Sequence, residues 1–231
     1  MFSPLIERAI ELAAEWHDGT YRKSRWRPPV FDIPSVEVDE GEPVRVLRVP
    51  VMAHVTTVAF TVQRAGWDDE TVAAAFLHDT VEDCNRYGQG LTLEALAAAT
   101  TSGVAERVRA VTEPKKAASG RFLPWQVRKE AYVEQLANGS DEAAAISLAD
   151  KLHNLWTMNQ GLAAGRDIFT RARHADGSPR GLSAGPTQQQ WYFQAVLGAV
   201  ARFADPRLEP QRMRLREEMA RFDALVGERT T

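Results

Sequence analysis

One local pattern recurs along most of this chain, and it restricts the fold to a mainly helical one. A Ser, Thr or Asp that can cap a helix usually precedes a stretch with apolar residues at helical spacing. On this basis helices are predicted over residues 4–18, 50–65, 69–84, 93 onward, 103–113, 123–136, 141–158, 187–204 and 208–227. We therefore expect an all-α fold, a helical bundle with short connections.

Two stretches depart from the helical pattern. In residues 30–51 β-branched and polar residues alternate on both sides of a DEGEP segment, which predicts a β-hairpin insertion. Residues 165–187 are rich in Gly, Pro, Arg and Ser and have no period, which predicts a long loop. Loops of this length are usually functional or disordered, and neither stretch has the composition of an interdomain linker. We expect one domain over residues 1–231, in which both segments influence substrate choice; the alternative is exposed decoration or an oligomer contact.

The overall composition excludes several classes of protein. The chain has a net charge of −3, and 44% of its residues are hydrophobic and 26% charged. This is the composition of an ordinary globular protein, so general binding to DNA or RNA is not expected. The single cysteine, Cys84, excludes an internal disulfide and a cysteine zinc cluster. No apolar run approaches membrane-spanning length and the first twenty residues do not read as a signal peptide, so a cytoplasmic location is expected. The oligomeric state is not predicted.

Four ionisable residues gather within six positions of the segment AAAFLHDTVEDC: His78, Asp79, Glu82 and Asp83. If the helix continues through them, all four share one face, and the aliphatic residues fall on the other. Acidic side chains on one face repel each other, so a pocket there would need a cation. The alternative for the last two is a solvated helix face.

Two further residues stand in apolar helical stretches: His54 in VPVMAHVTTVAF and Asp150 in AAAISLADKLHNL. A buried carboxylate requires a partner, and a cation bridging His54, His78, Asp79 and Asp150 would serve all four. A mixed His and Asp set suits Mn²⁺, Fe²⁺ or Zn²⁺ better than Ca²⁺. Taken singly, His54 could instead be a hydrogen-bonded core residue, and Asp150 could pair with Lys151.

Four segments in this order resemble the HD-domain hydrolases of the RelA/SpoT type, in particular the small stand-alone alarmone hydrolases. They are HDGTYRK (17–23), VMAHVTTVA (52–60), FLHDTVED (76–83) and SLADKLHNLWT (147–157). The resemblance covers roughly residues 5–160. The predicted hairpin interrupts it, since the family joins its Arg-Lys pair to the first metal histidine by a short loop.

The resemblance implies a role for each matching residue. A metal ion, Mn²⁺ in that family, would be held by His54, His78, Asp79 and Asp150. Glu82 and Asp83 would position the attacking water and move its proton. The nucleotide would be contacted by Arg22, Lys23, Asn154 and Thr157.

The implied activity is metal-dependent hydrolysis of the 3′-pyrophosphate of an alarmone nucleotide, (p)ppGpp or (p)ppApp, with release of pyrophosphate. One alternative is a phosphatase that acts on another phosphorylated ribose, such as the 2′-phosphate of NADPH. Another is a non-catalytic nucleotide sensor on the same scaffold, which the complete acidic set disfavours.

Overall fold

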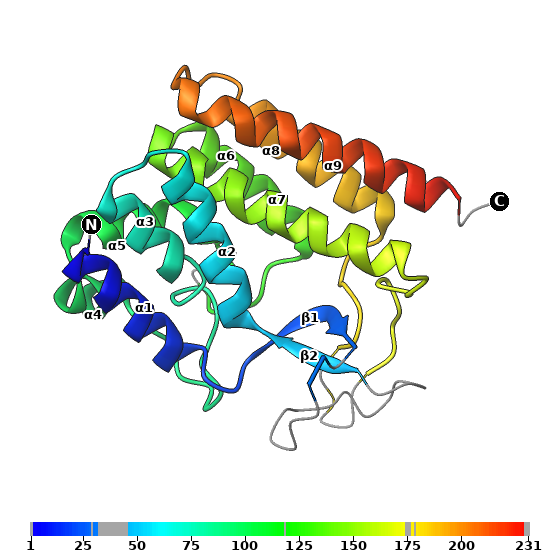
Figure 1. Ribbon diagram of the computed structural model, residues 1–231, viewed down its shortest axis with the longest axis horizontal. Coiled ribbons are helices and arrows are strands. Elements are labelled where there is room, and N and C mark those ends of the chain that lie inside the picture. The colour runs from blue at the N-terminus through cyan, green and yellow to red at the C-terminus, as the bar shows by residue number, and fades with distance from the viewer. Residues whose placement is uncertain are drawn as a thin grey trace.

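The computed structural model describes residues 2–28, 30–31, 46–117, 119–173, 177 and 179–228, without the side chains of Lys23, Ser24 and Trp26. In this part of the chain a bundle of α-helices carries one two-stranded antiparallel sheet (Figure 1), which confirms the predicted fold class. The elements are α1 (Pro4–Trp16), β1 (Tyr21–Arg27), β2 (Leu47–Pro50), α2 (Val51–Arg64), α3 (Asp69–Leu77), α4 (Leu93–Ala99), α5 (Ser102–Val111), α6 (Trp125–Ala137), α7 (Asp141–Ala163), α8 (Pro186–Val200), the 3₁₀ turn η1 (Pro206–Leu208) and α9 (Glu209–Gly227).

Side-chain caps fix the beginnings of several helices where the sequence predicts them. Ser3, Asp68, Thr92 and Ser140 each accept a hydrogen bond from a backbone N–H in the first turn of α1, α3, α4 and α7. Such a bond satisfies one of the donors that a helix leaves unpaired at its N-terminus. The helices therefore begin close to their predicted positions.

The prediction for the end of the third helix is wrong. α3 ends at Leu77 and not at Cys84, and residues 78–83 form turns. The carbonyl oxygen of Leu77 accepts from both the backbone N–H and the hydroxyl of Thr80, at 3.0 and 2.7 Å. Polar side chains that compete for main-chain carbonyls in this way favour a turn over another helical turn. The common helical face expected for the acidic residues after α3 therefore does not form.

The antiparallel sheet differs from the predicted hairpin in its first strand. β2 lies within the predicted segment, but its partner β1 precedes that segment. The strands pair Tyr21 with Pro50 and Arg27 with Leu47, and the register is irregular between these two points. Residues 32–45, which include most of the predicted hairpin, lie outside the described residues. β1 thus leads from α1 to the edge of the bundle, and β2 returns directly into α2.

Helix α7 occupies the centre of the arrangement and packs against α2, α3, α5 and α9. Figure 1 shows it running across the middle of the molecule, with α9 along one side and α2 crossing the other. All residues from Ala143 to Lys151 are buried, so Asp150 is located in the core. Residues 165–185 contain no helix where they are described, which agrees with the predicted loop. Among the described residues no helix is long and apolar enough to cross a membrane.

Candidate metal centre and its cavity

The structure brings together the four side chains that the sequence suggests as metal ligands. His54 comes from α2, His78 and Asp79 from the turn after α3, and Asp150 from α7. Nε2 of His54 lies 3.1 Å from Oδ1 of Asp150 and 3.6 Å from Oδ2 of Asp79. Nε2 of His78 lies 3.2 Å from Oδ1 of Asp79 and 3.8 Å from Oδ1 of Asp150. Ligand atoms of His54, His78 and Asp150 all lie within 4.8 Å of one another.

The two ring nitrogens at the centre of this cluster are the strongest sign of a cation site. Both histidines are buried, and neither Nε2 atom has a hydrogen-bond partner. Nδ1 of His78 donates to the carbonyl oxygen of Ala75 at 2.8 Å, so in the neutral ring the lone pair is on Nε2. Buried nitrogen lone pairs that face carboxylates are unfavourable alone but suit a divalent ion. The residues present therefore fit a divalent metal.

The electrostatics differ between the two histidines. Burial by itself lowers the pKa of His78, but the carboxylates of Asp79 and Asp150 overcome this effect and raise it to about 9. For His54, burial and then the nearby Arg22 lower the pKa well below its usual value. Positive charge is thus stabilised at His78, where a divalent ion would displace the proton, and His54 is neutral and able to ligate.

Asp150 has further partners on its own helix. Its Oδ2 accepts from Nζ of Lys151, and its Oδ1 accepts from Nδ2 of Asn154 at 2.6 Å. Burial alone would raise the pKa of Asp150, but Lys151 and the two histidines bring it well below its usual value. Asp150 can therefore pair with Lys151 and still face the two histidines, because Oδ2 contacts Lys151 and Oδ1 faces the histidines.

A cavity of about 330 Å³ opens beside the cluster. It is lined by eight of the residues that the sequence suggests: Arg22, His78, Asp79, Glu82, Asp83, Asp150, Asn154 and Thr157. The long loop contributes Ile168, Leu182 and Ser183, so its part of the wall is largely apolar. The cavity is thus acidic around the cluster and less polar where the loop covers it.

Glu82 and Asp83 are held at the wall by residues from the segment after α5. Oε2 of Glu82 accepts from the backbone N–H of Glu113 at 3.1 Å, and Nζ of Lys115 lies 3.4 Å from Oε1. The same ammonium group donates to Oδ1 of Asp83 at 2.6 Å. Burial and the charge of Asp79 raise the pKa of Glu82, and Lys115 opposes that shift.

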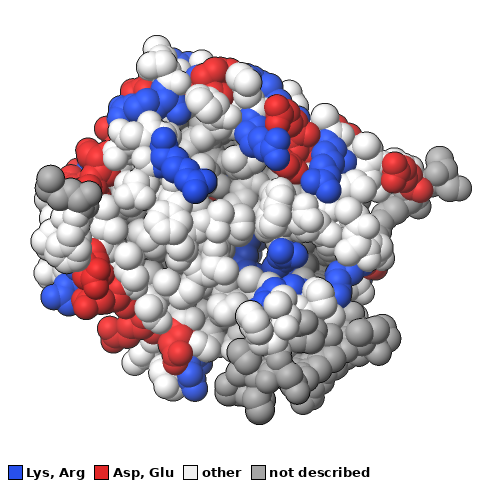
Figure 2. Space-filling model, in the orientation of Figure 1, with Lys and Arg blue, Asp and Glu red and all other residues white. Residues whose placement is uncertain are grey.

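The predicted nucleotide contacts lie on β1 and α7. Arg22 donates to the side-chain oxygen of Asn154, so the two approach the cavity as a pair. The hydroxyl of Thr157 is buried, lines the cavity and has no hydrogen-bond partner. The side chain of Lys23 lies outside the described residues. In Figure 2, Lys and Arg side chains surround a hollow in the face where Figure 1 shows β1.

Several residues of the cavity were not predicted from the sequence. Glu113 is buried and pairs with Arg128 and Lys129, and all three line the cavity together with Lys115. Glu113 and Lys115 follow α5 in a segment without regular period, whereas Arg128 and Lys129 lie on α6. A pattern search along one element could not join them, because the contact arises only when α5 and α6 pack together.

His153 was also missed, although its position carried a signal. It follows Asp150 by three residues on a predicted helix, and residues at this spacing lie on the same face. Its Nδ1 lies 2.6 Å from Nδ1 of His54. The cluster therefore contains a third histidine behind the first two.

Comparisons with known proteins identify the family of the chain. A family model described as HD domain matches residues 44–173. The chain is 32% identical over 153 residues to the guanosine-3′,5′-bis(diphosphate) 3′-pyrophosphohydrolase MESH1 of Danio rerio, covering 64% of this chain and 70% of that protein. It is 31% identical over 153 residues to a GTP pyrophosphokinase of Streptomyces coelicolor, a match that covers 66% of this chain but only 14% of that longer protein.

Two solved structures have a similar fold. One belongs to a metazoan ortholog of SpoT that hydrolyses ppGpp; its TM-score is 0.61 at 23% identity, covering 95% of this chain and 96% of that one. The other is a protein of Listeria monocytogenes, with a TM-score of 0.57 at 26% identity, covering 72% of this chain and 90% of that one. Together with the match to residues 44–173, these results confirm the expected resemblance. The chain belongs to the HD domain family.

Proposed function

We propose that this chain is a divalent-metal-dependent hydrolase that removes the 3′-pyrophosphate of ppGpp. The observation that carries the proposal is the buried His and Asp cluster, which opens onto a cavity with carboxylates and basic side chains on its wall. The names of the MESH1 relatives, at up to 36% identity, support the same substrate. The complete set of acidic residues is what a hydrolase needs and a simple nucleotide sensor does not.

The proposed metal ligands are His54, His78, Asp79 and Asp150, and the proposed ion is Mn²⁺. Imidazole nitrogens and carboxylate oxygens in one set suit this ion. When bound, a divalent ion supplies Lewis-acid chemistry, since it activates water and offsets the charge on phosphoryl oxygens. The partnerless Nε2 atoms of the two buried histidines support the assignment.

Glu82 is proposed as the general base. Burial and Asp79 raise its pKa above the usual value of a glutamate, and a carboxylate of raised pKa is a better proton acceptor. Glu82 would take a proton from water as the water oxygen attacks the phosphorus joined to the 3′-oxygen. The bond between that phosphorus and the 3′-oxygen breaks, the proton passes to the 3′-oxygen, and the products are GDP and pyrophosphate. Asp83, fixed by Lys115, would orient the water.

The nucleotide contacts are proposed to come from Arg22, Lys23, Asn154 and Thr157. The unpaired buried hydroxyl of Thr157 and the amide of Asn154 both line the cavity, which supports a role in substrate binding. Arg22 carries positive charge to the same wall, where it can offset phosphate charge.

The proposal extends to the whole chain. We infer that residues 1–231 act as one domain, because a single buried apolar cluster includes residues from Ala9 to Phe222. We also propose a cytoplasmic location, where a nucleotide substrate of this kind would be available. Cell fractionation tests the location, and recovery of the protein in the membrane pellet would contradict it.

The decisive experiment offers ppGpp, ppApp and NADPH to the purified protein with Mn²⁺ and separates the products by chromatography. We expect GDP and pyrophosphate from ppGpp, no turnover in excess chelator, and recovery when Mn²⁺ is restored. Asp79→Ala serves as the inactive control. The proposal is wrong if ppGpp is untouched while NADPH loses its 2′-phosphate, or if turnover continues in excess chelator.

A further inference from the structure

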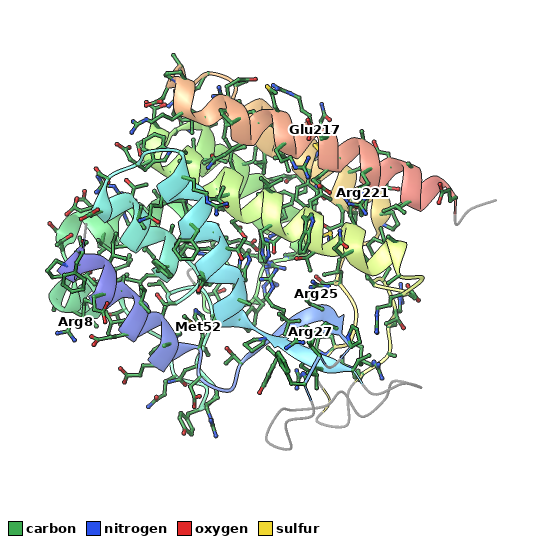
Figure 3. The ribbon with its side chains drawn as sticks, in the orientation of Figure 1. Arg8, Arg25, Arg27, Met52, Glu217 and Arg221 are labelled. Carbon is green, nitrogen blue, oxygen red and sulfur yellow. The ribbon has the colours of Figure 1, made fainter. Side chains whose placement is uncertain are left out.

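Three aromatic rings, those of His54, His153 and Trp156, lie in sequence beside the cluster. The rings of His153 and His54 are nearly parallel and meet edge to edge through their Nδ1 atoms, with centroids 4.9 Å apart and an interplanar angle of 25°. The ring of His153 is also nearly parallel to that of Trp156, with centroids 5.8 Å apart and an interplanar angle of 18°. The guanidinium of Arg25, which Figure 3 labels on β1 beneath α7, lies 5.4 Å from the centroid of a Trp156 ring. The ring of His153 therefore contacts both His54 and Trp156.

The hydrogen bond between His54 and His153 has only two possible directions. The two Nδ1 atoms are 2.6 Å apart, and a neutral imidazole has one donor nitrogen and one acceptor nitrogen. If His54 donates, its lone pair lies on Nε2, which faces the carboxylates of Asp79 and Asp150. If His54 accepts, its Nε2 carries the hydrogen and cannot ligate. The orientation of this one bond therefore decides whether His54 can bind a cation.

For His78, the hydrogen-bond acceptor at Nδ1 is a main-chain carbonyl group. Nδ1 of His78 donates to the carbonyl oxygen of Ala75, and a carbonyl oxygen can only accept. His54 lies within α2, and the acceptor for its Nδ1 is a side chain of α7. Each histidine thus has an acceptor at Nδ1, but only that of His54 can be changed by mutation.

We propose that His153 is a positioning residue for the metal ligand His54: its Nδ1 accepts the hydrogen of the His54 Nδ1 and so keeps the Nε2 lone pair directed at the metal. This inference rests on the proposed metal-dependent function. The nearly parallel rings, with the two Nδ1 atoms facing each other edge to edge, place the acceptor in the plane that a ring N–H donor needs, and Trp156 packs beside His153. Because the acceptor is an imidazole and not a carboxylate, the two aspartates remain the source of negative charge at the site.

Two variants separate the effect of the hydrogen bond to His54 from the effect of ring packing at position 153. His153→Phe retains an aromatic ring at this position but has no acceptor. His153→Asn loses the ring but places an oxygen at the same distance from the backbone as Nδ1. Loss of an outer hydrogen-bond partner typically weakens metal binding by 10–100-fold. We therefore expect Mn²⁺ affinity to fall by about 10-fold or more in His153→Phe and to recover largely in His153→Asn.

The measurement titrates Mn²⁺ alone into each protein and follows free Mn²⁺ by electron paramagnetic resonance, with circular dichroism as the check on folding. Equal affinity of His153→Phe and wild type would overturn the inference, and so would an equal loss in His153→Phe and His153→Asn. If the wild type itself binds no divalent ion, the proposed function fails. If it binds Mn²⁺ and both variants match it, only the inference about His153 fails.

Discussion

Lys115 allows the role of Glu82 to be tested without changing Glu82. The proposed base works only when deprotonated, so activity is lost as the pH falls through the pKa of Glu82. The ammonium group of Lys115 lowers that pKa against the effects of burial and of Asp79. Replacing Lys115 by Met keeps much of the side-chain length and removes the charge. The acidic limb of the kcat/KM profile should therefore move to higher pH.

The size of the shift follows from the distance between the two groups. At 3.4 Å, opposite unit charges attract by about 1 kcal/mol in bulk water and about 5 kcal/mol at an effective dielectric constant near 20. The side chains of Lys115 and Glu82 are 28% and 22% exposed, so solvent screens the pair and the lower part of this range applies. A value of about 1.4 kcal/mol corresponds to one pH unit in the midpoint of the limb.

The assay compares pH profiles of kcat/KM for ppGpp in the wild type, Lys115→Met and Lys116→Met. Lys116 is the matched control, because it carries the same charge one position along and its Nζ lies over the ring of Phe122 at 5.1 Å. The position of the limb is the readout, because a lost phosphate contact would lower activity at every pH. An unmoved limb in Lys115→Met, or an equal shift in both variants, would refute this account of Glu82.

Three further predictions follow from the same site. Glu82→Gln should retain bound Mn²⁺ while kcat falls by about 10²–10⁴-fold, whereas Asp150→Ala should lose the metal. Metal analysis of the purified variants, together with steady-state kinetics, tests both expectations. Asp79 and Asp150 raise the pKa of His78 to about 9, so Mn²⁺ should displace a proton from this ring at neutral pH. The affinity for Mn²⁺ should therefore rise about tenfold per pH unit up to that pKa, and calorimetry in two buffers should detect the released proton. Glu113→Gln leaves two cations of the cavity wall without their buried partner and should cost about 3 kcal/mol in urea unfolding, whereas an unchanged midpoint would contradict the pairing.

The helices and the cluster were predictable because their signals are local. Caps such as Ser3 and Ser140 act within one turn, and the apolar surroundings of His54 and Asp150 mark them as buried within their own helices. The end of α3 was not predictable from the sequence pattern, because the segment FLHDTVEDC contains no Gly or Pro that would mark a helix end. At this end the hydroxyl and the backbone N–H of Thr80 both donate to the carbonyl oxygen of Leu77, so a turn replaces the next helical turn.

Contacts between distant segments account for the remaining differences. The pairing of β1 with β2 depends on two short segments separated by more residues than a tight hairpin allows, and β1 is a run of polar and aromatic residues without apolar alternation. Glu113 meets Arg128 and Lys129 only after α5 packs on α6. Nothing in a single stretch of sequence reports such contacts.

The early end of α3 divides the site into two parts that should differ in amide hydrogen exchange. Asp150 is located in the buried part of α7, whose amides we expect to be among the most protected from exchange. Glu82 lies in the turn that follows Leu77, where few helical hydrogen bonds hold the backbone, so its amide can exchange through a local opening. The two core helices thus hold His54 and Asp150 in a buried frame, whereas the position of the proposed proton-transferring carboxylate depends on its contacts with Glu113 and Lys115.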